Sequence, residues 1–344
     1  MKLWTNDAEA RLRSAYADQR VCVTGGAGFI GSHLVDCLLN LGASVAIIDD
    51  LSTGDAEYPA HLIDKWGDRV RFIYASILEP PALRAATENA SVVFHLAAIG
   101  SVPQSISEPE RTMDVNLTGT VRVAEAARRA KSRRLVFASS SAIYGDTSQL
   151  PITEDAPIKP MSPYAASKAA AEHVVRAWSA SYALSGVSLR YFNIFGPRQS
   201  ADNQYAAVIP AFISAIASGK HPTINGDGSF TRDFAPVANA VYANLLAGAS
   251  TSNLTGQAVN IACAAKTSIK QLAEQIASLM GRPDLDPAFA PPRKGDIPHS
   301  VASIDAARKL LGYEPIATPE QGLRELVEWA QMSAEQRAKA EPCG

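Results

Sequence analysis

The chain contains 344 residues, 47% of them hydrophobic and 19% charged, and it carries a formal net charge of −2. That length allows one large domain or two moderate ones, and the composition is typical of a globular protein. The absence of a basic excess argues against nucleic acid as a partner.

The first twenty residues, MKLWTNDAEARLRSAYADQR, are polar and lack the apolar core of a signal peptide. No apolar run in the sequence is long enough to span a bilayer. The four cysteines, Cys22, Cys37, Cys263 and Cys343, follow no Cys-x-x-Cys or Cys/His spacing. We therefore predict a cytoplasmic protein with reduced thiols, no metal site and no membrane partner.

Short β-branched runs alternate with helical patterns through the first half of the chain. Strands are expected at residues 21–24, 45–48, 70–74, 92–96, 134–139 and 187–192, and helices at 29–42 and 119–131. Alternation at this spacing predicts βαβ units and an α/β fold with a doubly wound parallel sheet.

The pattern changes after residue 192 to loops rich in Pro and Gly, with a helix expected at 269–281. A strand-like segment at 258–262 is expected to return to the main sheet. We predict a Rossmann domain over residues 1–193, joined by residues 234–262. Residues 194–233 and 263–335 would form a smaller mixed α/β substrate lobe over the carboxyl edge of the sheet, where open α/β folds bind ligands.

A glycine motif follows the first expected strand. Gly25, Gly28 and Gly31 stand in TGGAGFIGSHL, between a strand and a helix, where missing side chains let the backbone approach a pyrophosphate. The N-terminus of the following helix favours the negative phosphates. Asp49 closes the second strand and is placed to accept hydrogen bonds from a ribose, and no Arg follows it. The sequence therefore predicts NAD, rather than NADP, as the cofactor.

A tyrosine and a lysine stand four residues apart in SPYAASK, so Tyr164 and Lys168 share one face of a helix. The lysine charge would lower the pKa of the phenol and make tyrosinate accessible near neutral pH. The strand before this helix ends in Ser139, Ser140 and Ser141, one of which could orient a substrate oxygen. Tyr164 could then take a proton from an alcohol while a hydride leaves its carbon.

Five motifs together, TGGAGFIG, HLAA, SSSAIYG, SPYAASK and RYFNIFGPR, resemble the extended short-chain dehydrogenase/reductase family over about residues 20–330. Within it the chain most resembles the NAD-dependent nucleotide-sugar 4-epimerases, especially those that act on UDP-N-acetylhexosamines. This resemblance implies an isomerase of polysaccharide biosynthesis that works as a homodimer. Two long helices, near 106–131 and 164–185, would form the dimer interface.

The resemblance also implies site residues. Tyr164 would be the base and acid, Lys168 would tune it and hold the nicotinamide ribose, and Ser140 would be the hydroxyl partner, with Ser141 as the alternative. Most relatives have Asp where this chain has Ser76, so the adenine contact there departs from the family pattern. The predicted cofactor residues are Gly25, Gly28, Phe29, Ile30, Gly31, Asp49, Ser76, Ile77, Ala97, Ala98, Asn116, Tyr164, Lys168 and Tyr191.

By the same resemblance, Arg232 and Arg293 would clamp the substrate diphosphate, because guanidinium groups suit phosphate oxygens. Ser300 stands where a bulky aromatic residue restricts the sugar pocket of some family members, so a serine there would admit a 2-acetamido group. Pro236 and Ala238 depart from the family, which commonly has an aromatic residue and an acid there. The other predicted substrate residues are Ser101, Ser140, Ser141, Asn193, Thr223 and Asn225, with Ile224 between the last two.

The related dehydratases carry an Asp-Glu pair after the catalytic hydroxyl, and this chain has Ser141 and Ala142 there. Ala142 also argues against the related decarboxylases, which usually keep the Glu. We therefore expect interconversion of UDP-GlcNAc and UDP-GalNAc, with some activity on UDP-Glc and UDP-Gal. Three alternatives remain: a UDP-glucuronate 4-epimerase, an enzyme with net redox or lyase chemistry, and a non-catalytic NAD-binding protein.

Overall fold

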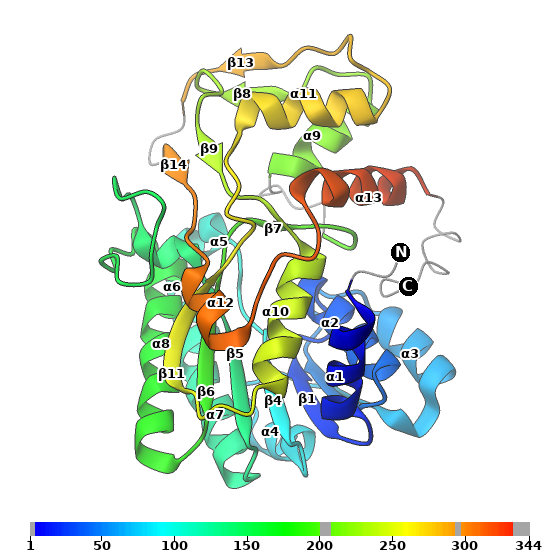
Figure 1. Ribbon diagram of the computed structural model, residues 1–344, viewed down its shortest axis with the longest axis vertical. Coiled ribbons are helices and arrows are strands. Elements are labelled where there is room, and N and C mark those ends of the chain that lie inside the picture. Colours follow the sequence, from blue (N-terminus) through cyan, green and yellow to red (C-terminus); the bar gives the residue numbers. More distant parts are fainter. Residues whose placement is uncertain (1–3, 200–207, 293–296, 333–344) are drawn as a thin grey trace.

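A seven-stranded parallel sheet forms the centre of the molecule, in the order β11-β6-β5-β4-β1-β2-β3 (Figure 1). The computed structural model describes residues 4–199, 208–292 and 297–332. Every neighbouring pair in this sheet is parallel, which confirms the predicted fold class. The strands are β1 (Arg20–Thr24), β2 (Ser44–Asp49), β3 (Val70–Tyr74), β4 (Val92–His95), β5 (Arg134–Ser140), β6 (Gly186–Tyr191) and β11 (Thr255–Ile261).

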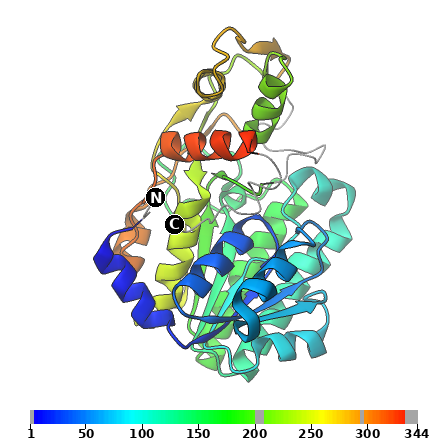
Figure 2. The same cartoon turned by 90° about the vertical axis from the view of Figure 1, so that its right-hand side faces the viewer.

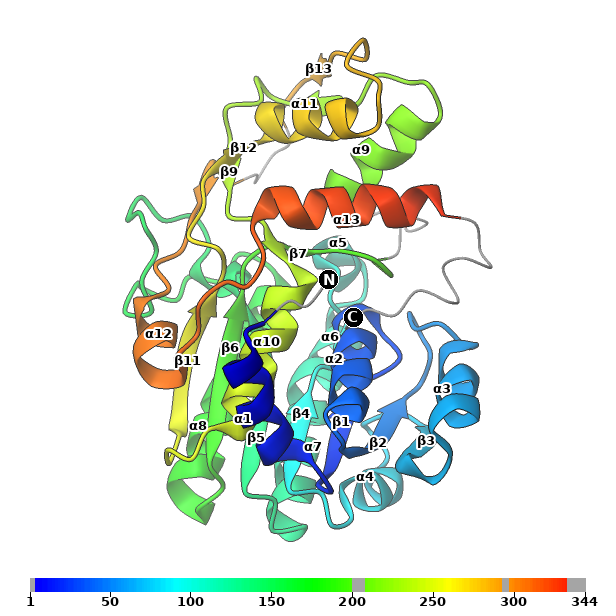
Figure 3. The ribbon, with the colours of Figure 1, turned by 45° about the vertical axis from the view of Figure 1, so that its right-hand side comes forward.

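Helices cover both faces of the sheet, which is why its central strands β1, β4, β5 and β6 are buried almost continuously rather than at alternate residues. In β1, Val21 and Val23 point into one hydrophobic core and Cys22 into the other. The first core lies under α2 (Phe29–Asn40) and α10 (Val237–Ala249), which pack against each other. The second lies under α4 (Pro80–Thr87), α7 (Gly119–Arg129) and α8 (Pro163–Tyr182) (Figure 3).

A smaller lobe stands at the end of the sheet where β6 leads into β7 (Ile194–Phe195) (Figures 1 and 2). Its hydrophobic core is formed by α9 (Val208–Ala217), α11 (Ile269–Leu279) and α13 (Pro319–Gln331). β9 (Thr231–Arg232) lies between β12 (Thr267–Ser268) and β14 (His299–Ser300), and β8 (Thr223–Asn225) pairs with β13 (Ala288–Ala290).

The chain passes repeatedly between the lobe and the sheet, and Asp233 links residues of different passages by hydrogen bonds. Its buried carboxylate accepts hydrogen bonds from the backbone N–H groups of Cys263 (2.9 Å) and Ala302 (3.3 Å). The other connecting elements are β10 (Ala235–Pro236), which pairs with β7, and α12 (Asp305–Leu311), which packs against β11 and α10. Part of the segment 263–335 therefore lies against the main sheet, not in the lobe.

The N-terminal segment forms a helix, α1 (Asn6–Tyr16), that packs on α10 (Figure 3). The buried Tyr16 hydroxyl donates to the Leu245 carbonyl (2.7 Å), and Trp4 stacks on Tyr242 with ring centroids 5.9 Å apart. The segment therefore has a structural function as a cover for α10, which the sequence alone did not reveal.

The helix expected at 106–131 is interrupted. It consists of α5 (Val102–Ser107), α6 (Pro109–Met113), a π-helical turn, η2 (Asp114–Thr118), and α7. Pro109 lacks an N–H group and so begins α6 instead of continuing α5. The second expected helix, near 164–185, is α8, which ends at Tyr182.

The prediction of reduced thiols is wrong for one cysteine. Cys22 and Cys263 are free thiols, whereas Cys37 is disulfide-bonded. A disulfide requires only that two Cβ atoms meet in space, which spacing along the sequence does not report. Within the described residues, no helix is long and apolar enough to cross a membrane.

Candidate active site

In the glycine turn between β1 and α2, the backbone of the helix lies close to the backbone of the turn. A Cβ atom at Gly31 would lie 2.0 Å from the Gly25 carbonyl oxygen, so no other residue allows α2 to pack on this turn. Gly25 has a φ of +70°, which glycine adopts without strain. No side chain caps α2 at Gly28. The N-terminus of α2 is therefore free to receive an anion such as a pyrophosphate.

Asp49 stands at the end of β2, beside the same turn. Its two carboxylate oxygens accept hydrogen bonds from the N–H groups of Ala27 and Leu51, each at 2.9 Å. Burial raises the pKa of the Asp49 carboxyl, and these backbone hydrogen bonds oppose that effect. Each oxygen keeps a lone pair for a ribose hydroxyl.

A cavity of about 280 Å³ extends from the glycine turn to α8. Thirteen of the predicted cofactor residues line it: Gly25, Gly28, Phe29, Ile30, Gly31, Asp49, Ser76, Ile77, Ala97, Ala98, Tyr164, Lys168 and Tyr191. The close backbone approach, the uncapped helix and the available carboxylate fit a dinucleotide. The residues that are present therefore suit NAD.

Asn116 is the one predicted cofactor residue that does not line this cavity. Its side chain lies in η2, accepts from the Ile99 N–H (2.8 Å) and donates to the Ile99 carbonyl (3.1 Å). It also donates to the Ser167 hydroxyl at 3.0 Å. Asn116 thus joins α8 to a loop whose residue Ile99 does line the cavity.

Sequence reasoning missed other lining residues, including Arg111 of α6 and the polar residues Asp50, Ser52 and Thr53. The last three follow Asp49 directly, so extending the prediction along that loop would have found them. Arg111 carries no sequence signal, because nothing in the helical pattern marks the face turned to the cavity. It pairs with Glu108 at 2.8 Å.

Tyr164 and Lys168 lie one turn apart at the start of α8. Ser162 caps this helix by accepting from the Ala165 N–H (3.2 Å), and Pro163 occupies its first turn. The buried Lys168 Nζ donates to the Ala138 carbonyl (2.8 Å) and lies 4.9 Å from the centroid of the Phe137 ring. Burial lowers the pKa of Lys168 to about 7, and the Glu172 carboxylate opposes that shift.

Of the three serines at the end of β5, Ser140 has the contacts that come closest to those predicted. Its hydroxyl interacts with the Tyr164 phenol, and its Oγ accepts from the Ala142 N–H (3.2 Å). Ser139 instead donates to Glu172. Ser141 begins the short helix η3 (Ser141–Tyr144).

The expected lowering of the Tyr164 pKa by Lys168 is not found. Burial raises the pKa of the phenol, and Ser140 is the group that lowers it. The physical reason lies in the lysine, whose ammonium is bonded to the Ala138 carbonyl and whose own charge is weakened by burial. The N-terminal dipole of α8 adds a second stabilising influence on a tyrosinate at this position.

Three predicted substrate residues come together where the lobe meets the sheet. Arg232 and Ser300 are in register on neighbouring strands, and the N–H of Asp233, the residue after Arg232, donates to the Ser300 carbonyl (2.8 Å). Asn193 donates through Nδ2 to the Asp233 carbonyl (3.1 Å). Arg232 Nη1 donates to the Thr231 and Pro298 carbonyls at 3.0 and 3.2 Å.

The remaining predicted substrate residues are dispersed. Thr223 and Asn225 lie on β8, which pairs with β13 in a separate sheet. Ser101 caps α5 by accepting from the Gln104 N–H at 3.2 Å. Arg293 lies outside the described residues, so only Arg232 of the predicted arginine clamp has a described position.

Comparison with known proteins identifies the family of this chain. Residues 21–262 match the model of the NAD dependent epimerase/dehydratase family. A UDP-glucose 4-epimerase from Mycolicibacterium smegmatis is 39% identical over 312 residues, covering 90% of this chain and 98% of the relative. A UDP-N-acetyl-alpha-D-glucosaminuronate decarboxylase from Bacillus cytotoxicus is 32% identical, covering 90% and 97%.

A solved structure is also similar to this chain. It is a UDP-N-acetylglucosamine 4-epimerase from Methanobrevibacter ruminantium M1, in complex with UDP-N-acetylmuramic acid. The TM-score is 0.85 and the sequence identity 38%, and the match covers 92% of this chain and 100% of that one.

Proposed function

We propose that this chain, which belongs to the NAD dependent epimerase/dehydratase family and is a UDP-sugar 4-epimerase, acts on UDP-GlcNAc and UDP-GalNAc. The reaction passes through a transient 4-keto sugar, and activity on UDP-Glc and UDP-Gal accompanies it. The observation that carries this proposal is the small, buried Ser300 beside Arg232.

The proposed catalytic residues act on the C4 hydroxyl of the sugar. Tyr164 takes its proton, and Ser140 orients its oxygen and lowers the pKa of the phenol. Lys168, one turn along α8, would hold the nicotinamide ribose. The residues that line the cavity would hold NAD, which would supply hydride transfer from C4 and back to its opposite face. Tyr164 then gives the proton back to the C4 oxygen, which completes the epimerisation.

The 4-keto sugar must rotate between the two hydride transfers while the nucleotide stays bound. Arg232 is proposed to hold the diphosphate, because a guanidinium fork suits phosphate oxygens. Its backbone lies in register with Ser300, so the diphosphate and the sugar would be held by adjacent strands. Asn193 joins this group through the Asp233 carbonyl and is proposed as a further substrate contact.

Elimination chemistry receives no support from the residues after Ser140. Ser141 and Ala142 occupy the positions where a dehydratase would need an acid and a base, and Ala142 only donates its N–H to the Ser140 hydroxyl. The similarity to a decarboxylase therefore does not change the proposal.

Proton NMR of the purified protein with UDP-GlcNAc, without added cofactor, tests the proposal. New anomeric signals of UDP-GalNAc are expected, since an epimerase regenerates its NAD in every turnover. If UDP-Glc or UDP-glucuronate reacts and UDP-GlcNAc does not, the sugar assignment is wrong. If none of the three reacts although NAD is bound, the chemistry is net redox or lyase.

Replacing Ser300 by tyrosine tests the pocket argument directly. The ring and a 2-acetamido group would compete for one volume, and overpacking of this kind costs about 1–3 kcal/mol. We expect Ser300→Tyr to lose about tenfold or more in kcat/KM for UDP-GlcNAc relative to UDP-Glc. Ser300→Ala is the matched control and should keep the ratio. An unchanged ratio in Ser300→Tyr would remove Ser300 from sugar selection.

We also propose that the enzyme is a homodimer. Exposed apolar side chains along α5 to α8 support this, among them Ile106, Met161 and Tyr182, at 65%, 62% and 52% exposure. Light scattering coupled to gel filtration would measure the mass, and a monomer would contradict the proposal. The cytoplasmic location stays a prediction, which cell fractionation would test.

A further inference from the structure

A groove of about 1240 Å³ lies at the end of the sheet opposite the cofactor cavity, and the two share no lining residue among those described. Its walls are α1, the second half of α10, the end of α12 and the loop 250–253. Figure 1 shows α1 and α12 on opposite sides of α10. Arg134 begins β5 at this groove, and Ser140 ends the same strand beside Tyr164. The seven residues of β5, at about 3.3 Å each, separate the two sites by about 20 Å.

Arg134 is a buried cation whose described acceptors are all neutral. Only 3% of its surface is exposed. Nη1 donates to the Ser185 hydroxyl, and Nη2 donates to the Ser250 and Ser252 carbonyls, both at 2.7 Å. Nε is buried as well and has no hydrogen-bond partner among the described residues. Arginine is almost never fully buried unless its charge is paired, so this guanidinium lacks a counter-charge.

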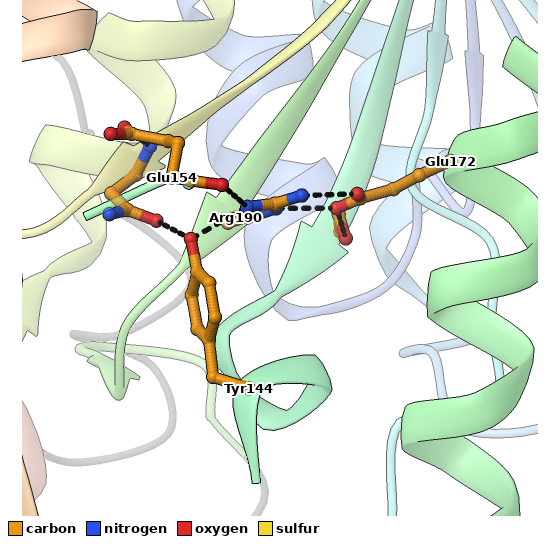
Figure 4. A network of polar contacts seen from close by, with 6 residues as sticks. Tyr144, Glu154, Glu172 and Arg190 are labelled. Carbon is orange, nitrogen blue, oxygen red and sulfur yellow. Dashed lines mark hydrogen bonds and ion pairs between the residues drawn. The ribbon is translucent and has the colours of Figure 1, made fainter. Parts of the chain in front are cut away.

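Arg190, a second buried arginine, shows how such a charge is balanced elsewhere in the molecule. It donates to the Glu172 carboxylate from Nε to Oε1 (3.0 Å) and from Nη2 to Oε2 (2.8 Å) (Figure 4). Its Nη1 donates to the Tyr144 hydroxyl (2.7 Å) and to the Glu154 backbone carbonyl (3.1 Å). All three nitrogens of this guanidinium therefore have acceptors, and the acceptors include a carboxylate. Within the described residues, Arg134 has neither an acceptor for Nε nor a carboxylate.

Two exposed arginines add positive charge to the same groove. Arg133 precedes Arg134 in the chain, and Arg11 lines the groove from α1. Neither forms an ion pair in the part of the chain that the structure describes, and no described aspartate or glutamate lines the groove. Burial and the charge of Arg133 lower the pKa of Arg134 to about 10. An anion bound in the groove would oppose both effects.

The rest of the groove offers apolar surface and neutral hydrogen-bond donors. Leu12, Leu246 and Leu310 line it, and Tyr242 adds an aromatic ring. Residues 250–253 read Ser-Thr-Ser-Asn, and their side chains can donate to ligand oxygens. Sites for small molecules measure about 300–1,000 Å³, so the groove has room for a molecule much larger than a phosphate ion.

We propose that this groove binds a nucleoside diphosphate at a site separate from the active site. A diphosphate carries more than one negative charge and several oxygens, which suits arginines placed at different points of one groove. The base of a nucleotide is flat and largely apolar, which suits the leucine and tyrosine side chains. An inorganic phosphate would use the positive charge and leave the apolar walls uncovered.

Titration calorimetry with ADP tests the proposal. ADP is added to the NAD-loaded protein after saturation with UDP, so that the cofactor and substrate sites are already occupied. We expect ADP to bind, and we expect Arg11→Gln and Arg133→Gln each to raise its Kd by about tenfold, the effect of losing a hydrogen bond to a charged group. Both side chains are exposed, so these variants should fold. Arg134 is left in place because it holds the loop after α10.

Arg84→Gln is the matched control, because it removes the same charge from an exposed position of α4, over the other core of the sheet, and should leave the Kd of ADP unchanged. If ADP does not bind, or if either groove variant binds it with the native affinity, the proposal is wrong. Inorganic phosphate should bind about tenfold or more weakly than ADP, because it buries none of the apolar surface, and equal affinity would overturn the assignment to a nucleotide. A polyglutamate peptide that binds where ADP does not would show that the groove receives an acidic protein segment instead.

Discussion

Several opposing influences act on the pKa of the Tyr164 phenol. Burial raises its pKa, while Ser140 lowers it and the N-terminus of α8 favours the anion. Lys168 does not shift the pKa of this phenol, and burial lowers the pKa of the lysine itself to about 7. The basicity of the site is therefore a property of the group of residues, not of the tyrosine alone.

Removing the phenol oxygen should abolish turnover and leave binding intact. Tyr164→Phe keeps the ring that lines the cavity but has no proton to exchange, and general acid–base catalysis contributes about 10²–10⁴-fold. We expect kcat to fall by that factor, with UDP binding and retained NAD unchanged by calorimetry and by release of the cofactor. Tyr74→Phe, at an exposed position of β3, is the matched control. A near-native rate would exclude Tyr164 from the mechanism.

Residue types and spacing predicted the cavity-lining residues well, because glycines in a turn and a Tyr–Lys pair on one helix face have few other geometries. The sequence could not predict which serine turns toward Tyr164. Alternation along β5 separates Ser139 from Ser140, and the direction of that alternation depends on the register of the sheet. Likewise, the position of Asn116 depends on a π-helical turn that has no sequence signature here.

At the scale of elements, α2 connects the cofactor turn to the segment that follows β7. His33 Nε2 lies 2.9 Å from the Pro197 carbonyl, and Arg198 pairs with Asp36 at 2.7 Å. One helix therefore begins at the proposed pyrophosphate site and also contacts the loop that follows β7. Burial, helped by the Arg198 charge, lowers the pKa of His33 to about 3.

This buried histidine predicts loss of stability in acid. The unfolded chain binds a proton at His33 below about pH 6.5, whereas the folded chain does so only near pH 3. The stabilising contribution is therefore complete above pH 6.5 and declines as the pH falls, by up to about 1.4 kcal/mol per pH unit. Urea unfolding of His33→Gln between pH 7 and 5 should show a slope flatter by that amount. His61→Asn, at an exposed site on α3 (Tyr58–Trp66), should keep the native slope.

Strand positions were predictable because buried parallel strands are continuous apolar runs, and all seven appear where the sequence indicates. The helix boundaries were less predictable. The segment 106–131 has a helical pattern on both sides of Pro109, and the chain breaks there because this proline lacks an N–H group and begins α6, which packs against α8.

At the scale of the whole molecule, α1 extends the first core beyond the seven-stranded sheet and its flanking helices. Tyr16→Phe removes one buried hydrogen bond to α10 and should reduce the free energy of unfolding by about 1 kcal/mol. Turnover of the sugar nucleotide should not change, because α1 contributes no residue to the cavity. Denaturant titration and the NMR assay measure both quantities, and a large loss of activity would show that α1 has a further role.

The repeated passage of the chain between sheet and lobe has a consequence for protease digestion. β7, β10, β12 and α12 each stand at a different crossing, and Asp233 joins residues from separate passages through its carboxylate. A protease that cuts one crossing would leave the others intact. Such a nicked enzyme should run as fragments on a denaturing gel and as one particle in gel filtration. The lobe therefore behaves as an inseparable part of one folded body, and it cannot be expressed as a module of its own by cutting the chain once.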